Sequence, residues 1–137
     1  MASFFQDLCG ILLSETASKF FNIHDNYGNT SGFQRETSSG YHSYDKYGNT
    51  TGYTSKTGSG YTHYDRYGSS TGYTRENTNG YTFYDRYGSI TGYTRKNSNG
   101  YTVYDRYGTT TGYIRKDTSG NLVQYDNYGN RLGYVNI

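Results

Sequence analysis

The chain has 137 residues, a formal net charge of +2, one cysteine and no proline. This length fits one domain, the single cysteine excludes an internal disulfide framework, and the small net charge gives no signal for a nucleic-acid or anionic-membrane partner. Leu, Ile and Val are too scarce for an ordinary aliphatic core, but aromatic residues make up 19% of the chain, and 20 of them are tyrosines. Because disordered segments are poor in aromatic residues, we expect a folded protein stabilised by packed tyrosine rings.

Residues 3–21 are predicted to form an amphipathic helix. Ser3 and Gln6 have the spacing of a capping box. Apolar residues recur on one face of this helix, namely Phe4, Leu8, Ile11, Leu12 and Phe20. We expect residues 1–21 to cover one end or one face of a sheet formed by residues 22–137. The alternative, an anchor on a membrane surface, is disfavoured because the polar face lacks a basic stripe.

The N-terminal residues do not read as a targeting signal. No basic segment precedes their apolar stretch, so we expect no signal peptide. No run approaches the roughly 20 apolar residues of a membrane span. The default localisation is the cytoplasm, and export by a non-classical route stays open.

From residue 22 onward the sequence repeats with a period of twenty. Residues 80–99 read GYTFYDRYGSITGYTRKNSN, and the segments on either side are near copies. A short fixed period indicates one supersecondary unit stacked on itself. We therefore expect about six repeats.

Each repeat is predicted to form a β-hairpin. The alternation of residue types from 81 to 85 has the period of a strand. Asp85 suits the first position of a type I turn, and Gly88 suits the positive φ of the bulge that completes a three-residue loop. Pairing across this loop places Tyr84 opposite Ile90 and Tyr81 opposite Tyr93, so that the last pair shares a face.

The second turn, near residues 96–100, leaves the register open. If Tyr93 lies opposite Tyr101, one continuous row is formed by Tyr41, Tyr53, Tyr61, Tyr73, Tyr81, Tyr93, Tyr101 and Tyr113. Cross-strand aromatic pairs contribute roughly 0.2–1 kcal/mol each. Such a row is expected to be a major source of stability.

The last repeat departs from the pattern by one extra residue. Terminal repeats commonly cap a stack, and this one brings a small apolar set, Leu122, Val123, Leu132, Val135 and Ile137. The expected fold is an all-β repeat protein, a meander of hairpins in a single-layer or solenoid-like sheet, with one N-terminal helix.

The run YTFYDRYGSITGY resembles the cell-wall-binding repeats of bacterial surface proteins. The copies of Tyr-Asp-x-x-Gly-x-x-x-Gly-Tyr are similar to the YD-like repeats of small bacterial proteins, and the glycine spacing is similar to that of MORN hairpins. The first resemblance implies a hairpin solenoid whose aromatic residues hold choline or carbohydrate between hairpins. The matching positions here are Tyr81, Tyr84 and Tyr93.

No catalytic or metal-binding pattern is present in the sequence. The three histidines occupy different repeat positions and have no cysteine at metal-ligand spacing. Asp65, Asp85 and Asp105 each occupy the first position of a predicted turn, where Asp is favoured for structural reasons. No phosphate loop or nucleophile motif occurs. We expect no enzyme, no cofactor and no metal.

The candidate binding residues are tyrosines and arginines. Arginines lie at the ends of the second strands of the hairpins, next to tyrosines. This combination of cations and aromatic rings is typical of a groove that binds single-stranded nucleic acid or an anionic glycan. The favoured interpretation is instead that Arg95 and its equivalents pair with carboxylates such as Asp105. The candidates are Tyr61, Tyr73, Tyr81, Tyr84, Tyr93, Tyr101, Tyr113, Arg75, Arg95 and Arg115.

Two classes of function remain open. The first is a non-catalytic structural or interaction protein that presents a tyrosine-rich β-surface to a protein partner or to its own copies, as an oligomer or filament. The alternative is a repeat module that binds a carbohydrate or a choline-like cation on its tyrosines.

Overall fold

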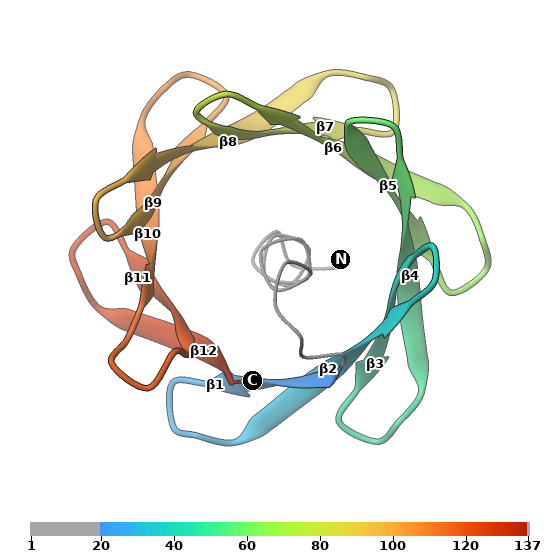
Figure 1. The fold of residues 1–137 in the computed structure, drawn as a ribbon, viewed down its shortest axis with the longest axis horizontal. Coiled ribbons are helices and arrows are strands. Elements are labelled where there is room, and N and C mark those ends of the chain that lie inside the picture. Colours follow the sequence, from blue (N-terminus) through green and yellow to red (C-terminus); the bar gives the residue numbers. More distant parts are fainter. Residues whose placement is uncertain (1–19, 137) are drawn as a thin grey trace.

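The computed structural model describes residues 20–136, which form a closed barrel of twelve antiparallel strands. Each strand pairs with its neighbours in the sequence, and β1 pairs with β12 to close the ring (Figure 1). The strands are β1 (Phe20–Asp25), β2 (Thr30–Thr37), β3 (Gly40–Asp45), β4 (Thr50–Thr57), β5 (Gly60–Asp65), β6 (Ser70–Asn77), β7 (Gly80–Asp85), β8 (Ile90–Asn97), β9 (Gly100–Asp105), β10 (Thr110–Lys116), β11 (Leu122–Asp126) and β12 (Arg131–Asn136).

The expected all-β fold of repeated hairpins is confirmed, but the sheet is neither open nor solenoidal. The expected helix over residues 3–21 lies outside the described residues except for Phe20 and Phe21, which belong to β1. Among residues 20–136, no helix is long and apolar enough to cross a membrane.

The first turn of each hairpin has the predicted structure. In the β7–β8 turn, the Gly88 amide donates to the Asp85 carbonyl oxygen at 3.1 Å, and the Asp85 amide donates to the Ser89 carbonyl oxygen at 2.9 Å. Gly88 has a φ of 87°, which glycine adopts without steric cost. The Asp85 carboxylate accepts hydrogen bonds from the amides of Tyr87 and Ser89. One aspartate therefore satisfies two backbone donors of the turn.

The predicted pairing beyond this turn is wrong by one residue. Tyr84 lies opposite Ile90 as expected, but Tyr81 lies opposite Thr94. Thr91 is a β-bulge, and its hydroxyl donates to the carbonyl oxygen of Phe83 at 3.3 Å. Because side chains alternate between faces, the extra residue moves Tyr93 to the opposite face from Tyr81. The same register shift occurs in all six hairpins.

The continuous tyrosine row is consequently two separate rows. The second turn between β8 and β9 contains two residues, as do those between β2 and β3, β4 and β5, and β6 and β7. It places Tyr93 opposite Tyr104 rather than Tyr101. The inner row comprises Tyr41, Tyr61, Tyr81 and Tyr101, and the outer row comprises Tyr53, Tyr73, Tyr93 and Tyr113.

The bulges and the glycines that follow them explain why the sheet closes. A bulge bends its strand and increases the local twist, and repeated bulge and glycine positions turn the corners of a barrel. A Cβ atom on Gly92 would lie 2.7 Å from the carbonyl oxygen of Tyr104 in the next strand. Glycine at this position therefore permits the close approach of neighbouring hairpins, and the pattern recurs in every repeat.

The C-terminal repeat joins the barrel instead of capping a stack. Its extra residue is absorbed in the turn between β10 and β11, where the Gly120 amide donates to the Asp117 carbonyl oxygen. At the seam, Val135 lies opposite Ile23 and is fully buried. Leu132 is 46% exposed, so it does not belong to the expected apolar cluster. Leu122 and Val123 are buried, and Ile137 lies outside the described residues.

The core lines the inner face of the barrel. Its buried apolar members are Ile23, Tyr41, Tyr61, Tyr81, Phe83, Val103, Ile114, Leu122 and Val135. Polar members form hydrogen bonds across strands: the ring nitrogens of His63 lie 2.8 Å from the hydroxyl of Thr54 and 2.7 Å from that of Thr74. The core of the described residues is therefore mixed, with four aromatic rings and five aliphatic side chains. The composition predicted the aromatic share, but aliphatic residues contribute more to the core than their scarcity suggested.

Candidate functional site

The barrel separates the ten predicted binding residues into two groups. Tyr61 and Tyr81 are buried in the core, and Tyr101 is half-buried against it. The other seven lie on the outer wall of the barrel. These are Tyr73, Tyr84, Tyr93, Tyr113, Arg75, Arg95 and Arg115. This second group faces the outside of the barrel, whereas Tyr61 and Tyr81 line a hollow of about 270 Å³ together with Tyr41.

The outer tyrosines pair with aromatic residues of the next hairpin. Tyr93 stacks on Tyr104 with ring centroids 4.9 Å apart, and Tyr53 stacks on Tyr64 at 5.0 Å. At the seam, His24 and Tyr134 stack at 4.6 Å. Aromatic pairs at this separation are favourable beyond the area that they bury. These aromatic pairs on the outer wall therefore stabilise the packing of neighbouring hairpins against each other.

The arginines of the outer wall lie over these rings. The guanidinium carbon of Arg95 lies 5.7 Å from the ring centroid of Tyr93, and that of Arg115 lies 5.2 Å from that of Tyr113. The favoured pairing of Arg95 with Asp105 is wrong. Arg95 lies opposite Thr102, while Asp105 lies opposite Gly92 at the other end of the strand, and the Asp105 carboxylate accepts hydrogen bonds from the amides of its own turn.

The most exposed aromatic residues in the described part of the chain are not among the predicted binding residues. Each first turn carries a tyrosine immediately before its glycine. We call these the tip tyrosines: Tyr27, Tyr47, Tyr67, Tyr87, Tyr107 and Tyr128. Their exposed fractions lie between 79% and 85%. Because strand direction alternates around the barrel, all six first turns lie at the same end, and the tip tyrosines form one rim.

Four neighbouring tips also carry a cation. Lys46, Arg66, Arg86 and Arg106 precede the tyrosines of their turns, and the distance from cation to ring centroid is 5.3 Å in the first two. The corresponding distances are 6.0 Å for Arg86 and 5.8 Å for Arg106. Asn26 and Asn127 stand at this position in the other two tips.

The sequence contained a signal for the tip tyrosines. Gly, Asn, Asp and Ser dominate turns because each satisfies a backbone requirement there. A tyrosine satisfies none, yet it recurs at the same turn position in all six repeats. Because turn geometry does not require a large ring at this position, its recurrence indicates a role outside the turn.

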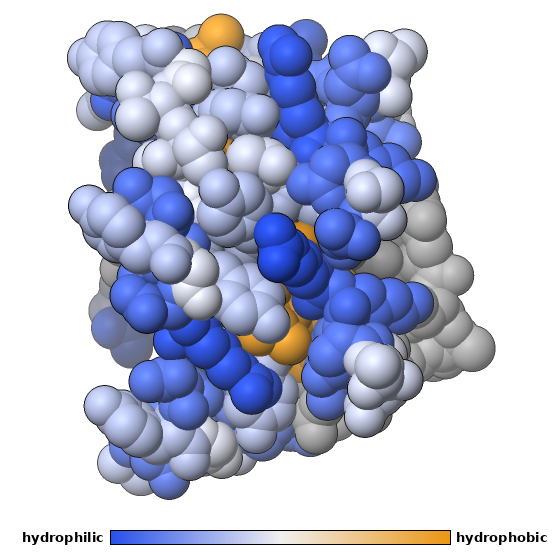
Figure 2. All heavy atoms as spheres, turned by 90° about the vertical axis from the view of Figure 1, so that its left-hand side faces the viewer, coloured by the Kyte–Doolittle hydropathy of each residue, from blue (hydrophilic) through white to orange (hydrophobic). Residues whose placement is uncertain are grey.

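Two hollows lie near these residues. A groove of about 360 Å³ runs along the outer wall over β7 and β8, and Tyr93, Arg95 and Arg106 line it. Figure 2 shows the wall beside it, where hydrophilic residues cover most of the surface and hydrophobic colour appears only in small gaps. The arginine-bearing wall is therefore a polar surface and not an apolar patch.

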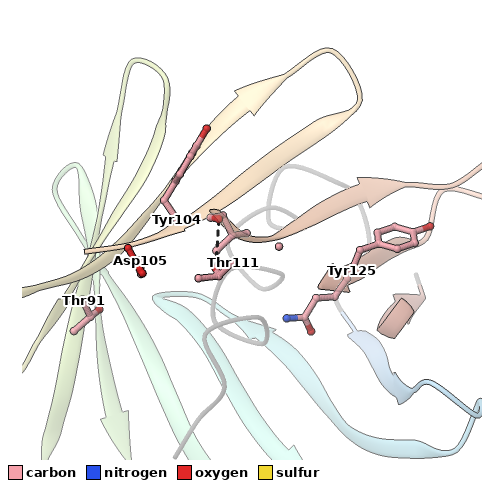
Figure 3. A pocket seen from close by; sticks show the side chains of 8 residues that line it. Thr91, Tyr104, Asp105, Thr111 and Tyr125 are labelled. Atoms are coloured by element: carbon pink, nitrogen blue, oxygen red, sulfur yellow. Dashed lines mark hydrogen bonds between the residues drawn. The ribbon is translucent and has the colours of Figure 1, made fainter. Parts of the chain in front are cut away.

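The second hollow, of about 320 Å³, lies beside the bulges of β8 and β10 (Figure 3). The Thr111 hydroxyl donates to the Val103 carbonyl oxygen at 3.3 Å, and the rings of Tyr104 and Tyr125 point away from Thr111. Asp105 supplies the one carboxylate of its lining, and that group already caps a turn. This hollow therefore lacks the pair of carboxylates in unlike environments that acid–base chemistry requires.

Titratable groups of the barrel respond to structural contacts. The hydrogen bond from the Asn49 amide lowers the pKa of Asp45 below its usual value, against a smaller raising effect of desolvation. Burial lowers the pKa of His63 from 6.5 to about 4. Within the described part of the chain, no group of three or more His, Cys, Asp or Glu side chains could hold a metal ion.

Comparison with known proteins adds no relative: no protein-family model, no curated protein and no solved structure matches the chain.

Proposed function

We propose that this protein is a non-catalytic interaction module. Its closed barrel presents the tip tyrosines as a contact rim for a protein partner or for further copies of the chain. The observation that carries the proposal is the exposure of these six rings, 79–85% each, on turns that aspartate and glycine hold in one conformation.

The physical argument is that exposed rings on rigid supports bind at low entropic cost. Tyrosine offers a large, rigid contact area with few torsions to order, and tyrosines are enriched in the energetically dominant positions of interfaces. Full burial of six tyrosines covers roughly 900–1,500 Å². A standard interface buries about 800 Å² per partner, so the rim is large enough for a specific complex.

The closed barrel changes the expected route of self-association. Open sheets associate through unpaired strand edges. Here β1 pairs with β12, so strands 20–136 leave no free edge. Contacts between copies would have to use side chains, and the rim offers the most exposed ones.

The proposal is tested by measuring mass in solution and by mapping contacts. Sedimentation velocity over a range of concentrations compares the wild type with a variant in which all six tip tyrosines are replaced by serine. In producing cells, a photo-crosslinking residue at position 87 is compared with one at position 98, an exposed serine on the opposite rim.

We expect the melting temperature of the six-serine variant to match that of the wild type, because the turn aspartates and glycines remain. We expect protein crosslinks, to the chain itself or to a partner, at position 87 and few at position 98. A wild type that stays monomeric and gives no more crosslinks at position 87 than at 98 would refute the proposal.

A further inference from the structure

The groove over β7 and β8 combines two cations from different hairpins. Arg95 comes from the outer face of β8, and Arg106 comes from the first turn of the next hairpin. Both side chains are exposed. The groove is also lined by Asn77, Thr82, Ile90 and Tyr93.

Among the described residues that line this groove, none is acidic. The nearest carboxylate in the sequence, Asp105, accepts hydrogen bonds from the amides of Tyr107 and Thr109 in its own turn. Two arginine side chains thus line a hollow to which the described lining residues contribute no negative charge. A guanidinium matches a carboxylate with two parallel hydrogen bonds.

We propose that this groove binds an acidic segment of a protein partner, with side-chain carboxylates held by Arg95 and Arg106. This inference rests on the proposed function, since it names the chemistry of the partner that the module binds. Ile90, which is 45% exposed, offers the apolar contact that a peptide side chain can use. The hydroxyl of Thr82, which accepts a hydrogen bond from the side-chain amide of Asn77 at 3.0 Å, adds a polar group to the lining.

A protein segment fits the groove better than a nucleic acid. Nucleic-acid binding draws most of its affinity from many phosphate contacts, and this groove has two cations. Non-specific recognition of single strands also needs open aromatic faces for the bases. The ring in the groove, Tyr93, already stacks on Tyr104 at 4.9 Å and has Arg95 over it at 5.7 Å.

The repeat supplies a pair of cations at the corresponding positions twice more. Arg75 and Arg86 occupy them one hairpin earlier, and Arg35 and Lys46 occupy them three hairpins earlier. Arg115 is matched by Asn127, and Arg66 is matched by Ser55. Neighbouring repeats are two strands apart, about 10 Å. An extended peptide advances roughly 3.3–3.6 Å per residue, so carboxylates three residues apart would reach both pairs.

The experiment measures binding of a fluorescein-labelled peptide of twelve residues with Glu at every third position and Gly or Ser between. Fluorescence anisotropy compares the wild type with the double variant R95Q/R106Q. The matched control is R131Q/K116Q, which removes the same two positive charges from exposed positions outside the groove. The version of the peptide with Gln in place of Glu and a twelve-nucleotide thymidine strand serve as further ligands.

We expect the acidic peptide to bind the wild type, to bind R95Q/R106Q at least tenfold more weakly, and to bind the control within twofold of the wild type. Equal losses of peptide affinity in both double variants would show a general effect of charge and would refute the assignment of the groove as the binding site. Tighter binding of the thymidine strand than of the peptide would also overturn it, in favour of a nucleic acid. Absence of peptide binding would refute this inference alone, because the mass and crosslinking measurements test the proposed contact rim independently.

Discussion

Within each first turn, three residues have separate tasks. Asp85 satisfies the backbone amides of Tyr87 and Ser89, and Gly88 adopts the positive φ. The side chain of Tyr87 is 85% exposed, and the Arg86 guanidinium lies near its ring. We therefore expect the turn to be stable without the tyrosine side chain.

His63 is one residue through which stability depends on pH. Its ring lies between the hydroxyls of Thr54 and Thr74 on the inner face, where Phe83 and Val103 stand in later repeats. Burial holds its pKa at about 4, against 6.5 for the exposed side chain. The unfolded chain therefore binds a proton on this group between pH 6.5 and 4, and the folded barrel does not.

We predict that the barrel loses stability through His63 as the pH falls from 6.5 to 4. A difference of 2.5 pKa units corresponds to roughly 3 kcal/mol at full extent. Urea unfolding at pH 7 and pH 4.5 should show a larger loss for the wild type than for His63→Phe, which keeps a ring and removes the titration. Equal losses in the two proteins would show that His63 has the same protonation in the folded and unfolded states, which would contradict the lowered pKa.

At the scale of the hairpin, the bulge decides what each tyrosine does. Tyr81 and Tyr93 occupy the same hairpin, but Thr91 places them on opposite faces. Tyr81 is 5% exposed and belongs to the core, whereas Tyr93 is half-buried and stacks on Tyr104. Two residues that look equivalent in the sequence thus stabilise the protein in different ways.

We predict unequal costs for replacing these tyrosines by serine. Tyr81→Ser removes a buried ring and should lower the free energy of unfolding by about 3–5 kcal/mol. Tyr93→Ser removes one cross-strand aromatic pair and should cost about 1 kcal/mol. Tyr87→Ser, at an exposed tip, should leave it unchanged. Chemical denaturation of the three variants checks this order, and equal losses at positions 81 and 93 would contradict the assignment of faces.

At the scale of the whole molecule, stability depends on the seam between β1 and β12. The seam pairs Ile23 with Val135 and His24 with Tyr134. It removes the two edges that a twelve-strand sheet would otherwise expose, and exposed edges promote aggregation. The chain must therefore bring its ends together before its outermost strands gain their partners.

We predict that Val135→Asp destabilises the barrel and that Leu132→Asp does not. Val135 is fully buried at the seam, whereas Leu132 is 46% exposed on the same strand. A buried carboxylate without a partner should cost about 4 kcal/mol or more, or roughly 10 °C in melting temperature. Thermal melts and light scattering check both variants, since an opened seam should also aggregate. Similar melting temperatures for the two would argue against closure through β12.

Local features were predictable because their causes lie within a few residues. The period of twenty indicated the repeat, and Asp85 with Gly88 indicated the turn. The bulge at Thr91 was missed because threonine is an ordinary strand residue. The available signal was the adjacent Gly92, since glycine within a strand often marks a bulge. That one missed residue reversed the face of Tyr93 and its equivalents, and with it the division of the candidate site.

The sequence by itself determined the hairpins, their turns and the dependence on tyrosine packing, since each follows from local backbone preference and composition. Only the tertiary structure decided that the sheet closes, which tyrosines line the core and which arginines lie beside tyrosine rings on the outer wall. The reason is that closure depends on the twist summed over twelve strands. Small contributions from six bulges and their glycines add around the ring until β1 meets β12, and no single repeat contains that result.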